Sequence, residues 1–361
     1  MQKRVQLPYI DLLKSIAIYF VVFYHGALGS ADFLTAPSWE TYLRYFFRTF
    51  LCVCVPLFFF INGYLLFRGE LNLRKHLCKT IKYVAITVIW GIITLVFRQV
   101  IDNEYLSVTE FIRALVNWKQ GWINHLWYMG ALVCIYVFFP LLKHVFDSNK
   151  TVFYYFVVIT GFLTFGNTCL NQIATGALAF FTESDTTLIG YNFFNIFNPY
   201  REIRGYAFVY FCLGGIAYDL TERINNVPAR KRNIISVVCI LLSCAGMFGT
   251  GVFYSEVSGS LFDVVWNGYD TVFALVNVVA VFVLSLNYRT DNIVIRNVSA
   301  NTLGIYFIHP IILTCIGRLL AQHGFVMPSG IRIVYVVVVV LICSALSSAI
   351  RKIPVLSGMV R

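Results

Sequence analysis

Three ionisable side chains, Asp11, Lys14 and His25, lie within one long apolar segment near the N-terminus. Ionisable groups inside a membrane helix are costly and usually serve a function. Lys14 and His25 are eleven residues apart, so on an α-helix they project from the same face, about 16 Å apart along the axis. Histidine can exchange a proton near neutral pH, which makes His25 a candidate general base.

A structural interpretation of these three residues is also open. Asp11 and Lys14 are one helical turn apart and could form an ion pair at the membrane interface. His25 could hydrogen-bond a neighbouring helix without taking part in any reaction. Both interpretations are compatible with the spacing.

A basic cluster, Arg74, Lys75, Lys79 and Lys82, lies at the start of a later apolar segment. Basic residues of this kind mark the cytoplasmic ends of membrane spans. The same charges could bind a polyanion at the cytoplasmic face, and a nucleotide cosubstrate with several phosphates would suit them.

Two further histidines, His125 and His309, begin or lie inside apolar segments. His309 follows Tyr306 and precedes Pro310, which removes a backbone donor and can open a kink that frees carbonyl groups. The sequence contains no His-Glu-x-x-His motif, so we expect no metal site. It also contains no Gly-x-Ser-x-Gly elbow and no phosphate-binding P-loop.

The composition indicates that lipid is the main solvent. Hydrophobic residues make up 59% of the chain and charged residues 12%, against about a quarter charged in soluble domains. The net charge of +11 is spread over short segments between apolar runs, so nucleic-acid binding is not indicated. The ten cysteines form no Cys-x-x-Cys pair and lie mostly in apolar runs, as small apolar residues do.

These features predict an all-α polytopic membrane protein, with one domain over residues 1–361. A span needs about 20 mostly apolar residues, and about ten segments meet that length. By the positive-inside rule, about 18 basic residues then lie on the inner side and about nine on the outer side, so we expect both termini in the cytoplasm. The expected spans are Tyr9–Leu28, Tyr45–Phe67, Cys78–Phe97, Leu126–Leu142, Val152–Cys169, Tyr206–Leu220, Ile234–Phe253, Thr271–Leu286, Thr302–Leu320 and Val334–Ile350.

Two longer segments, Arg98–His125 and Leu170–Gly205, would be outer loops. Both are rich in aromatic and amide side chains. These could form an interfacial aromatic belt, or a shelf for a sugar ring, and the pattern favours neither. The side chains concerned are Trp118, Trp122, Asn124, Tyr191, Asn192, Asn195, Asn198 and Tyr200.

Four segments carry a recognisable pattern: Ile10–His25, Pro56–Leu65, His125–Leu142 and Leu303–Pro310. Together they resemble acyltransferase family 3, whose membrane proteins O-acylate bacterial polysaccharides, lipopolysaccharide and peptidoglycan. The first shares the family's basic residue, ten intervening residues and histidine. One departure is Lys79-Thr80-Ile81-Lys82 where the family often has Arg-x-x-Arg, so charge is kept and the bidentate fork is lost. Asn62 stands where serine is common.

The resemblance implies a multi-pass O-acyltransferase of the bacterial inner membrane, most simply an O-acetyltransferase. It would move an acyl group from cytoplasmic acetyl-CoA, or another acyl-CoA, to a hydroxyl of a cell-surface or lipid-linked polysaccharide, with no tightly bound cofactor. In this scheme His25 acts as general base or transient acyl carrier, with Asp11 and Lys14 as the other catalytic candidates. The basic cluster of Arg74, Lys75, Lys79 and Lys82 would hold the CoA phosphates, and the site would be oriented by His125, Tyr306 and His309.

Two other classes of protein remain as alternatives. A transporter or flippase also carries intramembrane charge and interrupted helices, but it commonly has two matching halves, and the sequence shows no internal repeat. A membrane-embedded binding protein without catalysis is the second alternative. The sequence leaves the acyl group, the acceptor and the oligomeric state open.

Overall fold

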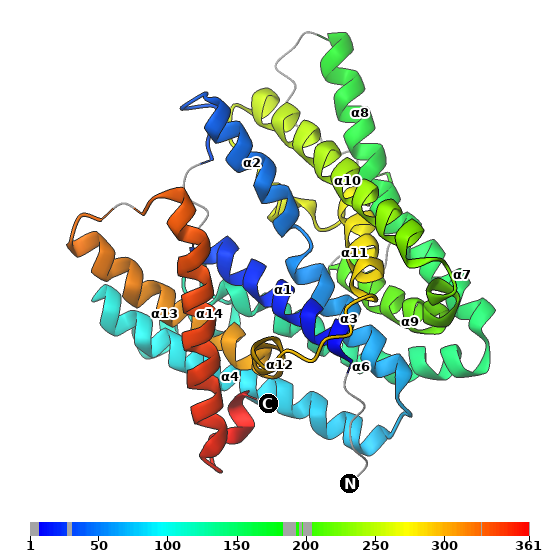
Figure 1. Ribbon diagram of the computed structural model, residues 1–361. Coiled ribbons are helices and arrows are strands. Elements are labelled where there is room, and N and C mark those ends of the chain that lie inside the picture. The colour runs from blue at the N-terminus through cyan, green and yellow to red at the C-terminus, as the bar shows by residue number, and fades with distance from the viewer. Residues whose placement is uncertain are drawn as a thin grey trace. The chain divides into compact units, whose positions relative to one another are not determined.

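The computed structural model describes residues 7–26, 31–182, 193–194, 197, 204–325 and 327–360. Within these ranges every regular element is a helix (Figure 1). The expected all-α class is therefore confirmed for the described part of the chain.

The helices group into two compact units, and each unit draws on two separate stretches of chain. Unit 1 comprises residues 1–68 and 151–300, and unit 2 comprises residues 69–150 and 301–361. The expectation of a single domain over residues 1–361 stays a prediction.

Unit 1 is held together by close contact between α3 and α9. A Cβ atom added at Gly63 of α3 would lie 1.8 Å from the carbonyl oxygen of Phe211, and one added at Gly214 of α9 would lie 2.0 Å from that of Phe60. Small residues let helix backbones approach in this way. The elements of unit 1 are α1 (Pro8–Gly26), α2 (Trp39–Leu51), α3 (Cys54–Arg68), α7 (Lys150–Gly161), the π-helical turn η2 (Phe162–Gly166), α8 (Asn167–Thr182), α9 (Gly205–Asn225), α10 (Ala229–Ser258), η5 (Trp266–Gly268), α11 (Val272–Ser285) and α12 (Ile293–Ala300).

Unit 2 packs α4 against α6 and α13 against α14. The indole of Trp90 in α4 stacks on Phe307 of α13, with ring centroids 5.4 Å apart, and donates a 2.9 Å hydrogen bond to the carbonyl oxygen of Met359. The elements of unit 2 are α4 (Leu73–Asp102), α5 (Val108–Val116), η1 (Asn124–Leu126), α6 (Trp127–Ser148), α13 (Thr302–Gln322), α14 (Ser329–Lys352) and η6 (Ser357–Val360).

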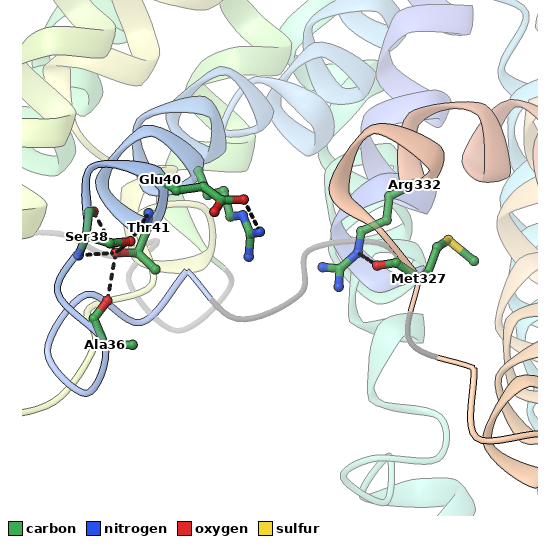
Figure 2. Close-up of polar contacts among 7 residues, drawn as sticks. Ala36, Ser38, Glu40, Thr41, Met327 and Arg332 are labelled. Atoms are coloured by element: carbon green, nitrogen blue, oxygen red, sulfur yellow. Dashed lines mark hydrogen bonds and ion pairs between the residues drawn. The ribbon is translucent and has the colours of Figure 1, made fainter.

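Local polar contacts define where helices start, as Figure 2 shows for two of them. At α2, the Ser38 hydroxyl accepts a hydrogen bond from the Thr41 backbone N–H at 3.2 Å, and the Thr41 hydroxyl accepts one from the Ser38 N–H at 3.0 Å. This reciprocal arrangement is a capping box. In unit 2, Arg332 near the start of α14 donates a 3.0 Å hydrogen bond to the Met327 carbonyl oxygen.

Seven helices in the described residues are long and apolar enough to cross a membrane, which agrees with a multi-pass protein. They contain seven of the expected spans. The other three expected spans coincide with α1, α9 and α11, which are not among the seven, and α11 is the shorter apolar helix Val272–Ser285. The count of about ten and the cytoplasmic position of both termini stay predictions. The seven candidates are Trp39–Arg68, Leu73–Asp102, Asn124–Ser148, Lys150–Leu178, Ala229–Ser258, Thr302–Gln322 and Gly330–Lys352.

The structure corrects three expected boundaries. The segment Tyr45–Phe67 is divided between α2 and α3 by a turn at residues 52–53, because Pro56 lacks the N–H that would bond the carbonyl of residue 52. The expected loop Arg98–His125 contains the end of α4 and the whole of α5. The expected loop Leu170–Gly205 begins inside α8, which continues to Thr182.

Candidate active site

His25 lies in the last turn of α1, and its side chain is exposed. The preceding residue, Tyr24, donates a 2.6 Å hydrogen bond from its hydroxyl to Oδ2 of Asp263. The Asp263 carboxylate also interacts electrostatically with the His25 imidazole. A segment of chain 239 residues away in sequence thus reaches the end of α1 that carries the candidate base.

Asp263 lies between α10 and α11 and is fixed by its own turn. Its Oδ1 accepts hydrogen bonds from the backbone N–H groups of Val265 at 2.9 Å and Trp266 at 3.2 Å. A short aspartate side chain commonly stabilises a turn in this way. Arg48 of α2 interacts electrostatically with Asp263, which offsets the negative charge of that carboxylate.

Asp11 and Lys14 lie in the opposite half of α1. The Ser299 hydroxyl of α12 donates a 2.5 Å hydrogen bond to Asp11 Oδ1. Ser15 reinforces the contact with a 3.1 Å hydrogen bond to the Ile295 carbonyl oxygen. Lys14 is half-buried, and along the helix it lies about 16 Å from His25. Direct contact of Asp11 or Lys14 with His25 is therefore excluded by helix geometry, and their catalytic roles stay predictions, as does their pairing.

In unit 2 the structure brings His125, Tyr306 and His309 together. The Tyr306 hydroxyl donates a 2.5 Å hydrogen bond to the His125 backbone carbonyl. The His125 ring lies 5.9 Å from the Tyr306 ring and 6.2 Å from the His309 ring, measured between centroids. All three side chains are buried, with His309 fully so. The turn η1, just before α6, and the middle of α13 therefore share one polar cluster, and its orienting role stays a prediction.

The tautomer of His309 follows from its hydrogen bond. Nδ1 lies 3.1 Å from the Ile305 carbonyl oxygen. A carbonyl oxygen can only accept, so Nδ1 carries the proton, and in the neutral ring Nε2 carries the lone pair. Pro310, the next residue, lacks the N–H that would bond the Tyr306 carbonyl.

The basic cluster occupies the first turns of α4. Arg74, Lys75 and Lys79 are exposed and Lys82 is half-buried. Lys79 donates a 3.3 Å hydrogen bond from Nζ to the Tyr136 hydroxyl of α6, and its ammonium lies 5.2 Å from the centre of that ring. The cationic head of Lys79 is thus held in place at the end of unit 2 where α4 begins.

His76 joins the same two helices. Its Nε2 lies 2.7 Å from the Tyr136 carbonyl oxygen, so Nε2 carries the proton and donates. Lys79 and Trp90 are eleven residues apart on α4, or about 16 Å along the axis. Trp90 stacks on Phe307, which is next to Tyr306 in the sequence. The histidine cluster of unit 2 therefore also lies roughly 16 Å from Lys79 along α4.

The comparisons with known proteins identify the family. A model of the acyltransferase 3 family, described as an acyltransferase domain, matches residues 7–348. The chain belongs to this family. No curated protein and no solved structure matches it. The resemblance found in the four sequence segments is thereby confirmed, and the protein is a membrane acyltransferase.

Sequence reasoning missed several residues around the candidate groups of this acyltransferase. Tyr24 and Asp263 were overlooked because one is a common aromatic and the other lies in a polar loop. Arg48 carried a usable signal, since it is a charge within an apolar, aromatic-rich stretch. Tyr136 had none, because a tyrosine in a membrane helix is ordinary.

The structure describes only some of the aromatic and amide residues that could form a shelf for a sugar ring. Trp122 is only 7% exposed, and the Lys119 ammonium lies 3.6 Å from the centroid of the Trp122 ring. This indole therefore packs within unit 2 rather than presenting an open face. The aromatic and amide residues of the second segment, Tyr191, Asn192, Asn195, Asn198 and Tyr200, lie outside the described residues.

Proposed function

We propose that this acyltransferase is an O-acyltransferase of the bacterial inner membrane. It moves an acyl group, in the simplest case acetyl from acetyl-CoA, to a hydroxyl of a cell-surface or lipid-linked polysaccharide. The observation that supports this most is the exposed His25 at the end of α1, next to the Tyr24–Asp263 hydrogen bond, in a chain of the acyltransferase 3 family.

The reaction needs one base and no metal. His25 accepts the proton of the acceptor hydroxyl as that oxygen forms a bond to the acyl carbon. The carbon–sulfur bond of the thioester then breaks, and the CoA thiolate receives the proton from the imidazolium. A two-step route, in which His25 first carries the acyl group, balances equally well.

The basic cluster of α4 would receive the donor. Arg74, Lys75, Lys79 and Lys82 present several positive charges to the phosphates of an acyl-CoA. Lysine acts on a phosphate as a point charge, without the paired geometry of arginine. The positive-inside distribution supports a cytoplasmic position for this cluster, with about ten spans and both termini in the cytoplasm.

Mass spectrometry of surface glycans tests the proposal. Cells would carry wild-type protein, His25→Ala, His144→Ala or no protein. His144 is an exposed histidine on α6 and serves as the matched control. We expect an acyl mass increment with wild type and His144→Ala, and none with His25→Ala or without the protein, at equal amounts of membrane-inserted chain.

Other outcomes would change the proposal in defined ways. An increment that survives His25→Ala would remove His25 from the reaction while leaving the family's activity in place. Unchanged glycans in all strains would exclude a glycan acceptor. Transport assays with a small acylated sugar would then test the flippase alternative.

A further inference from the structure

The contacts at the end of α1 assign a task to a residue far away in the sequence. Asp263 touches α1 through the Tyr24 hydroxyl at 2.6 Å. It touches its own turn through two backbone N–H groups, those of Val265 and Trp266. One carboxylate thus joins the last turn of α1 to the segment between α10 and α11.

The segment that carries Asp263 is itself anchored to α2. The Tyr45 hydroxyl donates a 2.7 Å hydrogen bond to the Phe262 carbonyl oxygen, and Tyr45 is fully buried. Ser255 of α10 accepts a 2.9 Å hydrogen bond from the Phe262 N–H. The carboxylate is therefore presented from a fixed backbone, which is what a positioning group requires.

The charge of Asp263 also suits a base that becomes positive. Transfer of a proton to His25 creates an imidazolium, and a nearby carboxylate stabilises that cation. Arg48 interacts electrostatically with Asp263 and Asp32, so the carboxylate is part of a small network with both signs of charge. Loss of Asp263 would remove the carboxylate that accepts the Tyr24 hydrogen bond.

We propose that Asp263 is a positioning residue for His25, which it orients through Tyr24 and whose imidazolium it stabilises during acyl transfer. The inference rests on the proposed function of His25. It names Asp263 as the partner of the base and Tyr24 as the link between them. In this role Asp263 acts through His25 and not on the acceptor or the thioester.

Purified protein in lipid nanodiscs tests this inference with two readouts. The first is steady-state acyl transfer from acetyl-CoA to the glycan fraction, with kcat and KM measured separately. The second is the rate of carbethoxylation of His25 by diethyl pyrocarbonate, followed by peptide mass spectrometry, which needs no turnover. The variants are Asp263→Asn, Asp263→Glu, Tyr24→Phe and Asp32→Asn. Asp32→Asn is the matched control, because Asp32 also interacts with Arg48 and accepts a backbone N–H, that of Leu34, at 3.0 Å.

We expect Asp263→Asn to lower kcat by roughly tenfold or more, with KM for acetyl-CoA nearly unchanged, because only the proton-transfer step loses its support. Tyr24→Phe should lose less, and Asp263→Glu should recover part of the rate. Carbethoxylation of His25 should become several-fold faster in Asp263→Asn. The amide oxygen stays bonded to the turn N–H groups, and the amide nitrogen that replaces Oδ2 cannot accept the Tyr24 hydrogen bond that anchors the last turn of α1. Asp32→Asn should match wild type in both readouts.

The two readouts separate failure of this inference from failure of the proposed function. Wild-type kcat and His25 reactivity in Asp263→Asn would overturn the positioning role while acyl transfer stands. Equal losses in Asp263→Asn and Asp32→Asn would also overturn it, since any charge near Arg48 would then have the same effect. If wild type transfers no acyl group, the proposed function fails. The carbethoxylation rates then decide alone whether Asp263 orients His25.

Discussion

The contact between α3 and α9 makes Gly63→Ala the most direct test of the fold. The added methyl group would lie 1.8 Å from the Phe211 carbonyl oxygen, whereas an ordinary contact begins at 3.4 Å. To reach that ordinary contact distance, the two backbones must separate by about 1.6 Å. The atoms nearest the added methyl group belong to the Phe211 backbone and not to the end of a flexible side chain, so the helices themselves must move.

Such overpacking costs about 1–3 kcal/mol or more. It should exceed the gain of about 1 kcal/mol that alanine brings over glycine in a helix interior. We therefore expect Gly63→Ala to lower the thermal midpoint clearly. Gly249→Ala in α10 is the matched control, because nothing lies within 4 Å of its added Cβ, and it should be neutral or stabilising.

The assay is the midpoint of heat-induced loss of monodisperse protein, measured by fluorescence-detected size-exclusion chromatography in detergent. Activity should fall as well, because α3 is joined to α1 by the 2.8 Å hydrogen bond between the Tyr64 and Tyr9 hydroxyls. A Gly63→Ala protein as stable as Gly249→Ala would refute the close backbone approach of α3 and α9.

Two further predictions concern unit 2. Lys79→Ala should raise KM for acetyl-CoA by roughly tenfold with little change in kcat, because a charge-assisted contact to phosphate contributes about 1.5–3 kcal/mol. The control is Lys231→Ala, which changes an exposed lysine of unit 1. An unchanged KM in Lys79→Ala would remove the donor-binding role of the basic cluster. Hydrogen bonds from the Ser107 hydroxyl and backbone N–H hold the pKa of Glu110 below its usual range. The ionised Glu110 therefore stabilises the start of α5 fully at a pH above the unfolded pKa of about 4.3. That stabilisation is lost as the pH falls through the lower pKa of the folded state. Amide exchange at residues 107–111, corrected for intrinsic rates, should become less protected below that pH in wild type, whereas Glu110→Gln should show no such pH step.

The family and the general class could be predicted from the sequence because both depend on local patterns. Long apolar runs need no partner to indicate membrane spans, since each satisfies its own backbone hydrogen bonds as a helix. The eleven-residue spacing of Lys14 and His25 defines one face of a helix wherever that helix lies. The basic start of α4 was recognisable for the same reason, as a cluster contiguous in sequence.

Element boundaries were less accessible, since small local features compete with long apolar runs. The break between α2 and α3 depends on Pro56 and a two-residue turn within a continuous apolar stretch. The extension of α8 to Thr182 crosses polar residues that resemble a loop in composition. In both places hydropathy is nearly uninformative about where a helix begins or ends.

Only the tertiary structure decided which side chains meet. Tyr24 and Asp263 are 239 positions apart, and Tyr306 and His125 are 181 apart. Each pair is brought together by helix packing, as in the glycine contacts of α3 and α9, and no periodicity along the chain encodes it. The sequence by itself determined a membrane acyltransferase with His25 as the candidate base. The partner of that base depended on the tertiary structure, because a hydrogen bond between distant segments exists only once the helices have packed.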